Sequence, residues 1–86
     1  MTTYALSKNA NQQLQKLPRN IQRKFLKQLN FLIQNSKHPS LRSRKMSGTE
    51  SYEARIDRKN RFTYLIQNGE TLIITIGPHD EGLGKK

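Results

Sequence analysis

Residues 51–76 decide the fold, and they read SYEARI, DRKN, RFTYLIQ, NGE, TLIITI. Apolar and polar side chains alternate in the first segment, which is typical of a strand with one buried face. The segment DRKN has the composition of a turn, and Asn68-Gly69 is a strong hairpin signal. The stretch therefore predicts three consecutive strands, at residues 51–56, 61–67 and 71–76, joined by two short turns.

The residues before this stretch predict a strand and two helices. TTYALS at 2–7 is typical of a short strand, and Ser7 suits the N-cap of a helix over 8–17. Pro18 suits the first turn of a second helix, because the N–H that proline lacks is unpaired there in any case. In this second helix the apolar residues recur at helical spacing over about three turns: Ile21, Phe25, Leu29, Leu32 and Ile33.

The connection between the helices and the three strands is polar and basic. NSKHPS at 35–40 breaks the second helix, and residues 41–50 predict a basic connector with a turn at Ser47-Gly48. The element order is then β-α-α-β-β-β. It predicts an α+β fold, in which a two-helix hairpin packs on one face of a small, mostly antiparallel sheet. We expect a single domain over residues 1–86, with a flexible tail at 82–86.

The charge is strongly positive and unevenly distributed. The chain carries 16 basic and 6 acidic residues, a net charge of +10, and residues 1–49 contain no acid. A field of this sign attracts polyanions, and nucleic acid is the first candidate because phosphate contacts supply affinity for any sequence. An acidic protein, an acidic lipid surface and a merely soluble basic domain remain alternatives.

Several classes of protein and of functional site are excluded or disfavoured, because the sequence lacks the residues or motifs that they need. The absence of cysteine excludes disulfide scaffolds, thiolate metal sites and cysteine nucleophiles. No apolar run approaches the roughly 18–20 residues that cross a bilayer, and the N-terminus does not resemble a secretory signal. Glycine-rich phosphate loops, nucleophile elbows and metal-ligand spacings are also missing. We expect a cytoplasmic protein without a cofactor or a metal, and without membrane contact.

Three basic side chains are predicted to converge at one face of the sheet. Alternation places Glu53 and Arg55 opposite the helices, Arg61 opens the next strand, and His79 follows the last one in TIGPHDEG (75–82). Arginine offers a two-pronged fork to phosphate oxygens, and histidine exchanges protons near neutral pH. RNA brings its own nucleophile, the 2′-hydroxyl. This group of residues therefore predicts phosphate chemistry on RNA.

Other interpretations of these residues stay open. Glu53 could be a salt-bridge partner of Arg55 or Arg61 rather than a catalytic group. Asp80 is a candidate to orient His79, or is simply a turn residue. His38 precedes a proline in a polar loop and is expected to take no part. Tyr52 and Tyr64 are expected to pack, with their hydroxyl groups at the sheet edge.

The order and spacing of several segments resemble the RelE/ParE superfamily of bacterial type II toxins. These segments are YALSKNANQQLQKLPRNIQRKFLKQL, KMSGTESYEARI and RFTYLIQNGETLIITIGPHDE, which together cover about residues 3–81. The resemblance implies the same β-α-α-β-β-β fold. It also implies a toxin that is neutralised by a cognate antitoxin, expected to be acidic and partly disordered when free.

The resemblance to RelE-like members implies a ribosome-dependent endonuclease that cleaves mRNA. It assigns the scissile phosphate to Arg61 and Arg55, and proton transfer to His79 as acid or base. Some relatives carry lysine where this chain has Glu53, and we expect Glu53 or Asp80 to assist. Many relatives end in a tyrosine that stacks on a substrate base, whereas this tail, EGLGKK, carries no aromatic residue. Contact with RNA is expected from a further basic set: Lys45, Arg44, Arg42, Arg58 and Lys59.

Two rival functions follow from the same resemblance. ParE-like members are non-enzymatic toxins that poison DNA gyrase, and His79 beside two arginines favours the nuclease over that activity. A domain with decayed catalysis, which only binds RNA or an antitoxin, is the other alternative.

Overall fold

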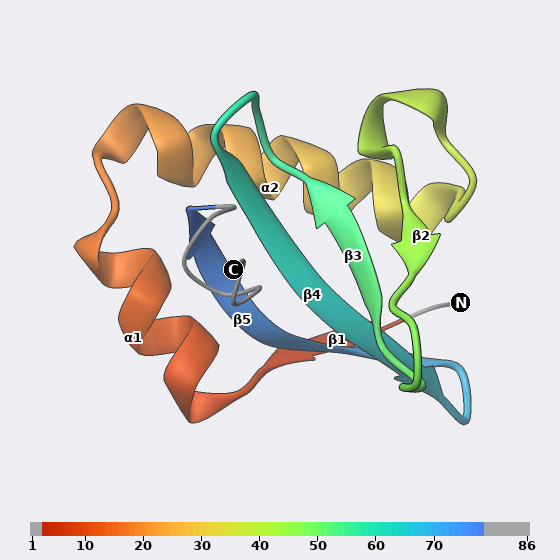
Figure 1. Ribbon diagram of the computed structural model, residues 1–86. Coiled ribbons are helices and arrows are strands. Elements are labelled where there is room, and N and C mark those ends of the chain that lie inside the picture. The colour runs from red at the N-terminus through yellow and green to blue at the C-terminus, as the bar shows by residue number, and fades with distance from the viewer. Residues whose placement is uncertain (1–2, 79–86) are drawn as a thin grey trace.

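The computed structural model describes residues 3–78, which form a five-stranded sheet with two helices on one face (Figure 1). The predicted α+β fold is confirmed, and the predicted helices and strands occur in the predicted order, with one further strand, β2. In chain order the elements are β1 (Thr3–Leu6), α1 (Lys8–Lys16), α2 (Arg19–Gln34), the 3-10 turn η1 (Pro39–Leu41), β2 (Arg44–Lys45), β3 (Tyr52–Arg55), β4 (Asn60–Gln67) and β5 (Glu70–Pro78).

The sheet is mixed, with strand order β1-β5-β4-β3-β2. The N-terminal strand β1 runs parallel to β5, and all other neighbours are antiparallel. The edge strand β2 was not predicted: residues 41–50 were expected to be a connector. Only Arg44 and Lys45 pair there, with Glu53 and Tyr52, and two residues are too short a run to leave an alternating pattern in the sequence.

The turns and caps follow the local sequence. The Ser7 hydroxyl accepts a hydrogen bond from the Ala10 amide, so it caps α1 as predicted. Pro18 directly precedes α2. Asn68 and Gly69 both have positive φ, at 51° and 79°, which is the conformation of a two-residue type I′ hairpin. These local signals set the lengths of the elements and therefore the register between β4 and β5.

The core lies between the sheet and the helices. In Figure 1, α2 crosses behind the sheet and α1 lies beside β5. Phe25 of α2 meets Phe62 of β4 edge to face, with ring centroids 5.2 Å apart. The buried apolar residues are Ala10, Phe25, Leu29, Leu32, Leu41, Ala54, Ile56, Phe62, Tyr64, Ile73 and Ile76.

A β-bulge in β5 changes which residues face the core. Thr63 pairs with Thr75 but Tyr64 pairs with Ile73, so Ile74 is the extra residue. The bulge is held by Ser7, whose amide donates to the Ile73 carbonyl and whose hydroxyl donates to the Ile74 carbonyl. Beyond the bulge, β5 continues to Pro78, two residues past the predicted end at Ile76.

Some sequence predictions concern residues outside the described range. His79, Asp80 and the tail at 82–86 all follow Pro78, the last described residue. Within residues 3–78, neither helix has the length and apolar character needed to span a membrane.

Candidate functional site

Five of the predicted site residues line one pocket of about 330 Å³ on the sheet. We call it the arginine pocket, and its residues are Arg42, Arg44, Glu53, Arg55 and Arg61. They come from the loop after η1 and from strands β2, β3 and β4. Four guanidinium groups and one carboxylate leave a net positive charge in this hollow, which suits an anion with several oxygens.

Arg55 and Arg61 lie directly opposite each other in the β3–β4 ladder. Like charges in this position disfavour strand pairing, by about 0.2–1 kcal/mol. Both side chains are only half-buried, so part of the repulsion is screened by water. The pairing of two arginines opposes the stability of the sheet, and an anionic ligand between them would remove that cost.

The turn between β3 and β4 orders both of these arginines. The Asp57 carbonyl accepts a hydrogen bond from Arg61 Nη1 at 2.6 Å and another from Arg55 Nε at 3.3 Å. Arg61 Nη1 also reaches the carbonyls of Asn60, at 3.1 Å, and Arg58, at 3.4 Å. All of the Arg61 bonds use one nitrogen, so within residues 3–78 the remaining N–H groups of its fork are available to a ligand.

Asp57 itself is tied to the turn by its carboxylate. Oδ1 accepts from the Lys59 amide at 2.9 Å, and from the Asn60 amide and side chain at 2.8 and 3.1 Å. Oδ2 lies 3.9 Å from Lys24 Nζ on α2. Burial raises the pKa of the Asp57 carboxyl, but these hydrogen bonds and the Lys24 charge outweigh it and hold the pKa below its ordinary value.

Glu53 is the one acid of the pocket. Its residue is 5% exposed, and Oε1 lies 3.6 Å from Arg44 Nε. A salt bridge from Glu53 to Arg55 or Arg61 was one of the predicted alternatives, and Glu53 forms an ion pair with Arg44, across the β2–β3 ladder. The Arg44 side chain is 74% exposed and the Glu53 side chain 7%, so water screens the arginine but scarcely reaches the carboxylate.

Arg42 stands at a strained backbone position beside the pocket. It is the C-cap of η1 and has φ 47° and ψ 43°, in the left-handed region that glycine and asparagine prefer. This conformation turns the chain from η1 toward β2. The strain coincides with a residue that lines the arginine pocket and also a second pocket.

The remaining predicted residues are divided between the rim and the undescribed end of the chain. Arg58 and Lys59 are exposed on the turn beside Arg61, and Lys45 is exposed on β2. Gly77 pairs with Arg61 and Pro78 with Asn60, so the described chain ends beside the arginine pair. His79 and Asp80 lie outside the described residues. Among residues 3–78, no three His, Asp or Glu side chains are grouped to hold a metal ion.

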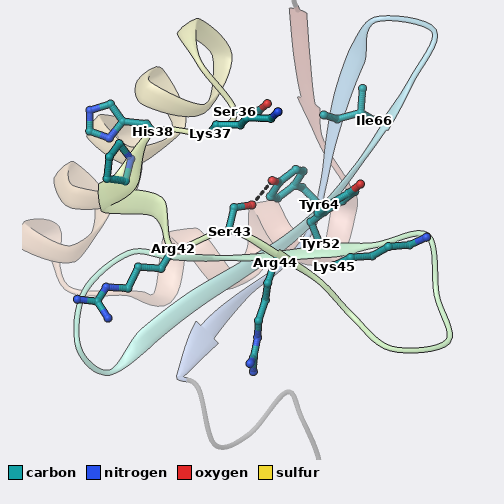
Figure 2. Close-up of a pocket in the computed structure, with 11 residues that line it drawn as sticks. Ser36, Lys37, His38, Arg42, Ser43, Arg44, Lys45, Tyr52, Tyr64 and Ile66 are labelled. Atoms are coloured by element: carbon teal, nitrogen blue, oxygen red, sulfur yellow. Dashed lines mark hydrogen bonds between the residues drawn. The ribbon is translucent and has the colours of Figure 1, made fainter.

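A second pocket, of about 470 Å³, lies against the other face of β2 and β3 (Figure 2). We call it the tyrosine pocket, because Tyr52 and Tyr64 stack there with ring centroids 5.5 Å apart. Figure 2 shows the Tyr64 hydroxyl bonded to Ser43, while Arg44 is directed away from both. Its other lining residues are Ser36, Lys37, His38, Pro39, Arg42, Arg44, Lys45 and Ile66.

The hydroxyl group of Tyr64 forms a hydrogen bond inside the tyrosine pocket. The Tyr64 hydroxyl was expected at the sheet edge, and it meets Ser43, which directly precedes the edge strand β2. The residue as a whole is 2% exposed. Burial raises the pKa of the Tyr64 phenol, the Ser43 hydrogen bond lowers it, and nearby Tyr52 raises it further; the net pKa lies above 10.0. The His38 ring stacks on the Phe31 ring, with ring centroids 4.0 Å apart. Nδ1 of His38 accepts a hydrogen bond from the Ser40 amide.

Gln28 connects α2 to the site and was not predicted as a site residue. The residue is 6% exposed, and Nε2 donates to the Arg55 carbonyl at 2.8 Å and to the Ser40 carbonyl at 3.1 Å. A signal was present, since Gln28 falls within the apolar stripe between Phe25 and Leu32. A polar residue on such a stripe needs buried hydrogen-bond partners.

A family model described as "ParE toxin of type II toxin-antitoxin system, parDE" matches residues 4–83. The chain belongs to this family. It is therefore a toxin of the RelE/ParE superfamily, as the resemblance implied. No curated protein matches the toxin's sequence.

Solved structures share the toxin's fold at low sequence identity. YoeB in its dimer from Staphylococcus aureus is 18% identical with a TM-score of 0.77, covering 91% of this chain and 97% of that one. RelE in the RelE–RelB complex from Pyrococcus horikoshii OT3 is 23% identical with a TM-score of 0.75, covering 94% and 98%. YafQ from E. coli strain BL21(DE3) is 11% identical with a TM-score of 0.78, covering 98% and 100%.

Proposed function

We propose that the toxin is an RNA endonuclease that cuts mRNA on the ribosome in the cytoplasm. The observation that carries the proposal is the arginine pocket, in which Arg55 and Arg61 face each other beside a buried carboxylate. Two facing arginines are costly in a sheet unless an anion separates them. A phosphodiester supplies that anion, and it needs fixed positive charge where the transition state gathers negative charge.

The proposed reaction uses the 2′-hydroxyl of the RNA as its nucleophile. This oxygen attacks the adjacent phosphorus and loses its proton to a base, while the bond from phosphorus to the 5′-oxygen breaks and that oxygen gains a proton from an acid. The products are a 2′,3′-cyclic phosphate and a 5′-hydroxyl. We assign phosphate stabilisation to Arg61 and Arg55, and no step to a metal.

Proton transfer is assigned to His79, as acid or base. Glu53 or Asp80 assists, and Glu53 is the carboxylate that already lies in the pocket. Arg42, Arg44, Lys45, Arg58 and Lys59 are proposed to contact the RNA backbone around the scissile phosphate. The basic surface of residues 8–45, which contains no acid, is proposed to bind ribosomal RNA.

An antitoxin is the second proposed partner. RelE from P. horikoshii was solved in complex with RelB, and the family is that of toxin–antitoxin toxins. We propose an acidic antitoxin, partly disordered when free, because its charge would complement the +10 of this chain.

The experiment is primer extension on a defined message translated in a purified system, with and without the toxin. Cuts within codons that require ribosomes, and that disappear with Arg61→Ala and His79→Ala, are the expected result. If a folded wild-type toxin leaves the message uncut, the nuclease proposal is overturned.

Inhibition of DNA gyrase is the second candidate function, because the matching family model is that of ParE. A supercoiling assay with purified gyrase tests it. Gyrase inhibition that persists in Arg61→Ala and His79→Ala, together with uncut message, would favour this candidate. Cut message with normal supercoiling would exclude it.

A further inference from the structure

The turn between β3 and β4 is closed by the Asp57 side chain together with two backbone hydrogen bonds. Asp57 Oδ1 accepts three hydrogen bonds from Lys59 and Asn60, so it acts as the cap of an Asx turn. The backbone closes the same loop, because the Ile56 and Asp57 amides both donate to the Asn60 carbonyl, at 2.9 and 3.3 Å. The peptide groups of residues 57–60 therefore have little freedom to rotate.

Asp57 also provides the carbonyl oxygen to which both Arg55 and Arg61 donate hydrogen bonds. The Asp57 carbonyl oxygen accepts from Arg61 Nη1 and from Arg55 Nε. Its direction depends on the peptide plane between Asp57 and Arg58, and the carboxylate of Asp57 restrains the turn that contains this plane by accepting from the Lys59 and Asn60 amides. The Asp57 carboxylate thus helps to set the position of the one carbonyl oxygen to which both guanidinium groups donate.

We propose that Asp57 is a positioning residue of the arginine pocket, whose carboxylate holds its own carbonyl oxygen where Arg55 and Arg61 converge on one phosphate. This inference rests on the proposed nuclease function. Preorganised donors act mainly in the transition state, since they need no rearrangement when charge develops. Asp57 therefore contributes to the rate of the chemical step more than to binding of the message.

The Lys24 ion pair is not the main reason for this role. Lys24 Nζ lies 3.9 Å from Oδ2 and its side chain is 53% exposed, which makes it a weak surface contact. The turn hydrogen bonds are shorter and all use the other oxygen, Oδ1. Asparagine can make those Oδ1 bonds without the charge, so the conservative substitution separates turn geometry from electrostatics.

The first test is single-turnover cutting on programmed ribosomes at saturating toxin. We expect Asp57→Ala to lower the cutting rate constant by about 10- to 100-fold, as for other displaced catalytic groups, with half-saturation changed less than about threefold. Asp57→Asn should recover most of the rate. Glu70→Ala is the matched control, because it also removes one negative charge but from the exposed start of β5, and it should cut like the wild type.

The second test needs no RNA. In ¹⁵N NMR spectra of the free toxin, the guanidinium N–H signals of Arg55 and Arg61 should be dispersed and slow to exchange in the wild type, in Asp57→Asn and in Lys24→Ala. In Asp57→Ala they should collapse to the averaged position of mobile arginines. This readout stands even if the message is not cut, so failure of the nuclease function and failure of the positioning role are told apart.

Two results would overturn the proposal. One is an Asp57→Ala toxin that keeps both its ordered arginine signals and its cutting rate. The other is an Asp57→Asn toxin that is folded by circular dichroism but has lost the ordered signals, since the turn would then depend on charge rather than on the cap. The second result decides the question even if Asp57→Ala does not fold.

Discussion

The arginine pocket and the tyrosine pocket lie on opposite faces of the same strands, and they differ in how their polar side chains are hydrogen-bonded. In the tyrosine pocket the buried hydroxyl of Tyr64 is satisfied internally, by Ser43. In the arginine pocket two guanidinium groups oppose each other, and Arg61 bonds the turn through one nitrogen only. The first arrangement stabilises the fold, whereas the second, in our proposal, provides donors and positive charge to an RNA phosphate. The comparison therefore predicts which substitutions affect activity and which affect stability.

The largest expected effect is on cutting, from Arg61→Ala. The rate should fall about 10²- to 10³-fold, as when one donor to a developing oxyanion is removed. Urea denaturation should reveal almost no loss of stability, because the repulsion from Arg55 is removed together with the turn bonds. Arg61→Lys should rescue only part of the rate, since a point charge cannot form a two-pronged contact. A fully active Arg61→Ala toxin would contradict the assignment of activity to the arginine pocket.

Tyr64→Phe should have the opposite profile. It leaves the Ser43 hydroxyl without its partner in a part-buried site, which costs about 1–3 kcal/mol of unfolding free energy. Cutting by the folded fraction should stay near the wild-type rate. Chemical denaturation monitored by circular dichroism measures the loss, and the double variant Tyr64→Phe with Ser43→Ala should recover part of it. Unchanged stability in Tyr64→Phe would mean that the buried hydrogen bond contributes nothing.

Gln28→Ala should affect both properties, because Gln28 connects α2 to the backbone of Arg55. Loss of its bonds to the Arg55 and Ser40 carbonyls should cost about 1 kcal/mol each. Freeing the end of β3 should also lower cutting by a few-fold, less than Arg61→Ala does. Exposed Gln15 on α1 provides a matched control, and Gln15→Ala should be neutral in unfolding experiments.

The smallest expected effect is the acid dependence of stability from Asp57. The pKa of this carboxyl is lower in the folded toxin than in the unfolded chain, where it is about 3.9. Asp57 therefore contributes stability above that value, and the contribution is lost as the pH falls through the lower folded pKa. Urea unfolding at a series of pH values from 6 to 2.5 should be flatter in Asp57→Asn than in the wild type. Identical pH profiles would contradict the depressed pKa.

Local signals in the sequence were sufficient for most of the architecture. The Ser7 cap, the Pro18 helix start and the Asn68-Gly69 hairpin depend on residues within a few positions of one another. The cap and the hairpin are confirmed, and Pro18 is the N-cap residue of α2, one position before the first turn where it was predicted. Predicted β-alternation also placed Arg55 and Arg61 on one face, and the structure brings them into register. The roles of the site residues stay predictions, with His79 and Asp80 outside the described range.

Other features could not be predicted, because they join residues far apart in the chain. The strand β2 exists only because β3 offers Arg44 and Lys45 a partner edge. The bulge at Ile74 is held by Ser7, and no window around residue 74 contains that information. Gln28 carried a signal as a polar residue on an apolar stripe, but its partners on η1 and β3 were not predictable from helical spacing.

The sequence by itself determined the charge of this toxin, its elements, and the strand alternation that separates the Arg55 and Arg61 face from the core. These properties depend on composition and on periodicity along a few residues, which local backbone geometry dictates. Tertiary structure alone decided that Asp57 presents one carbonyl oxygen to both arginines, that Arg44 pairs with Glu53, and that Ser43 satisfies Tyr64. Such contacts depend on strand register and on the position of turns in space, and both are set only when the whole core packs.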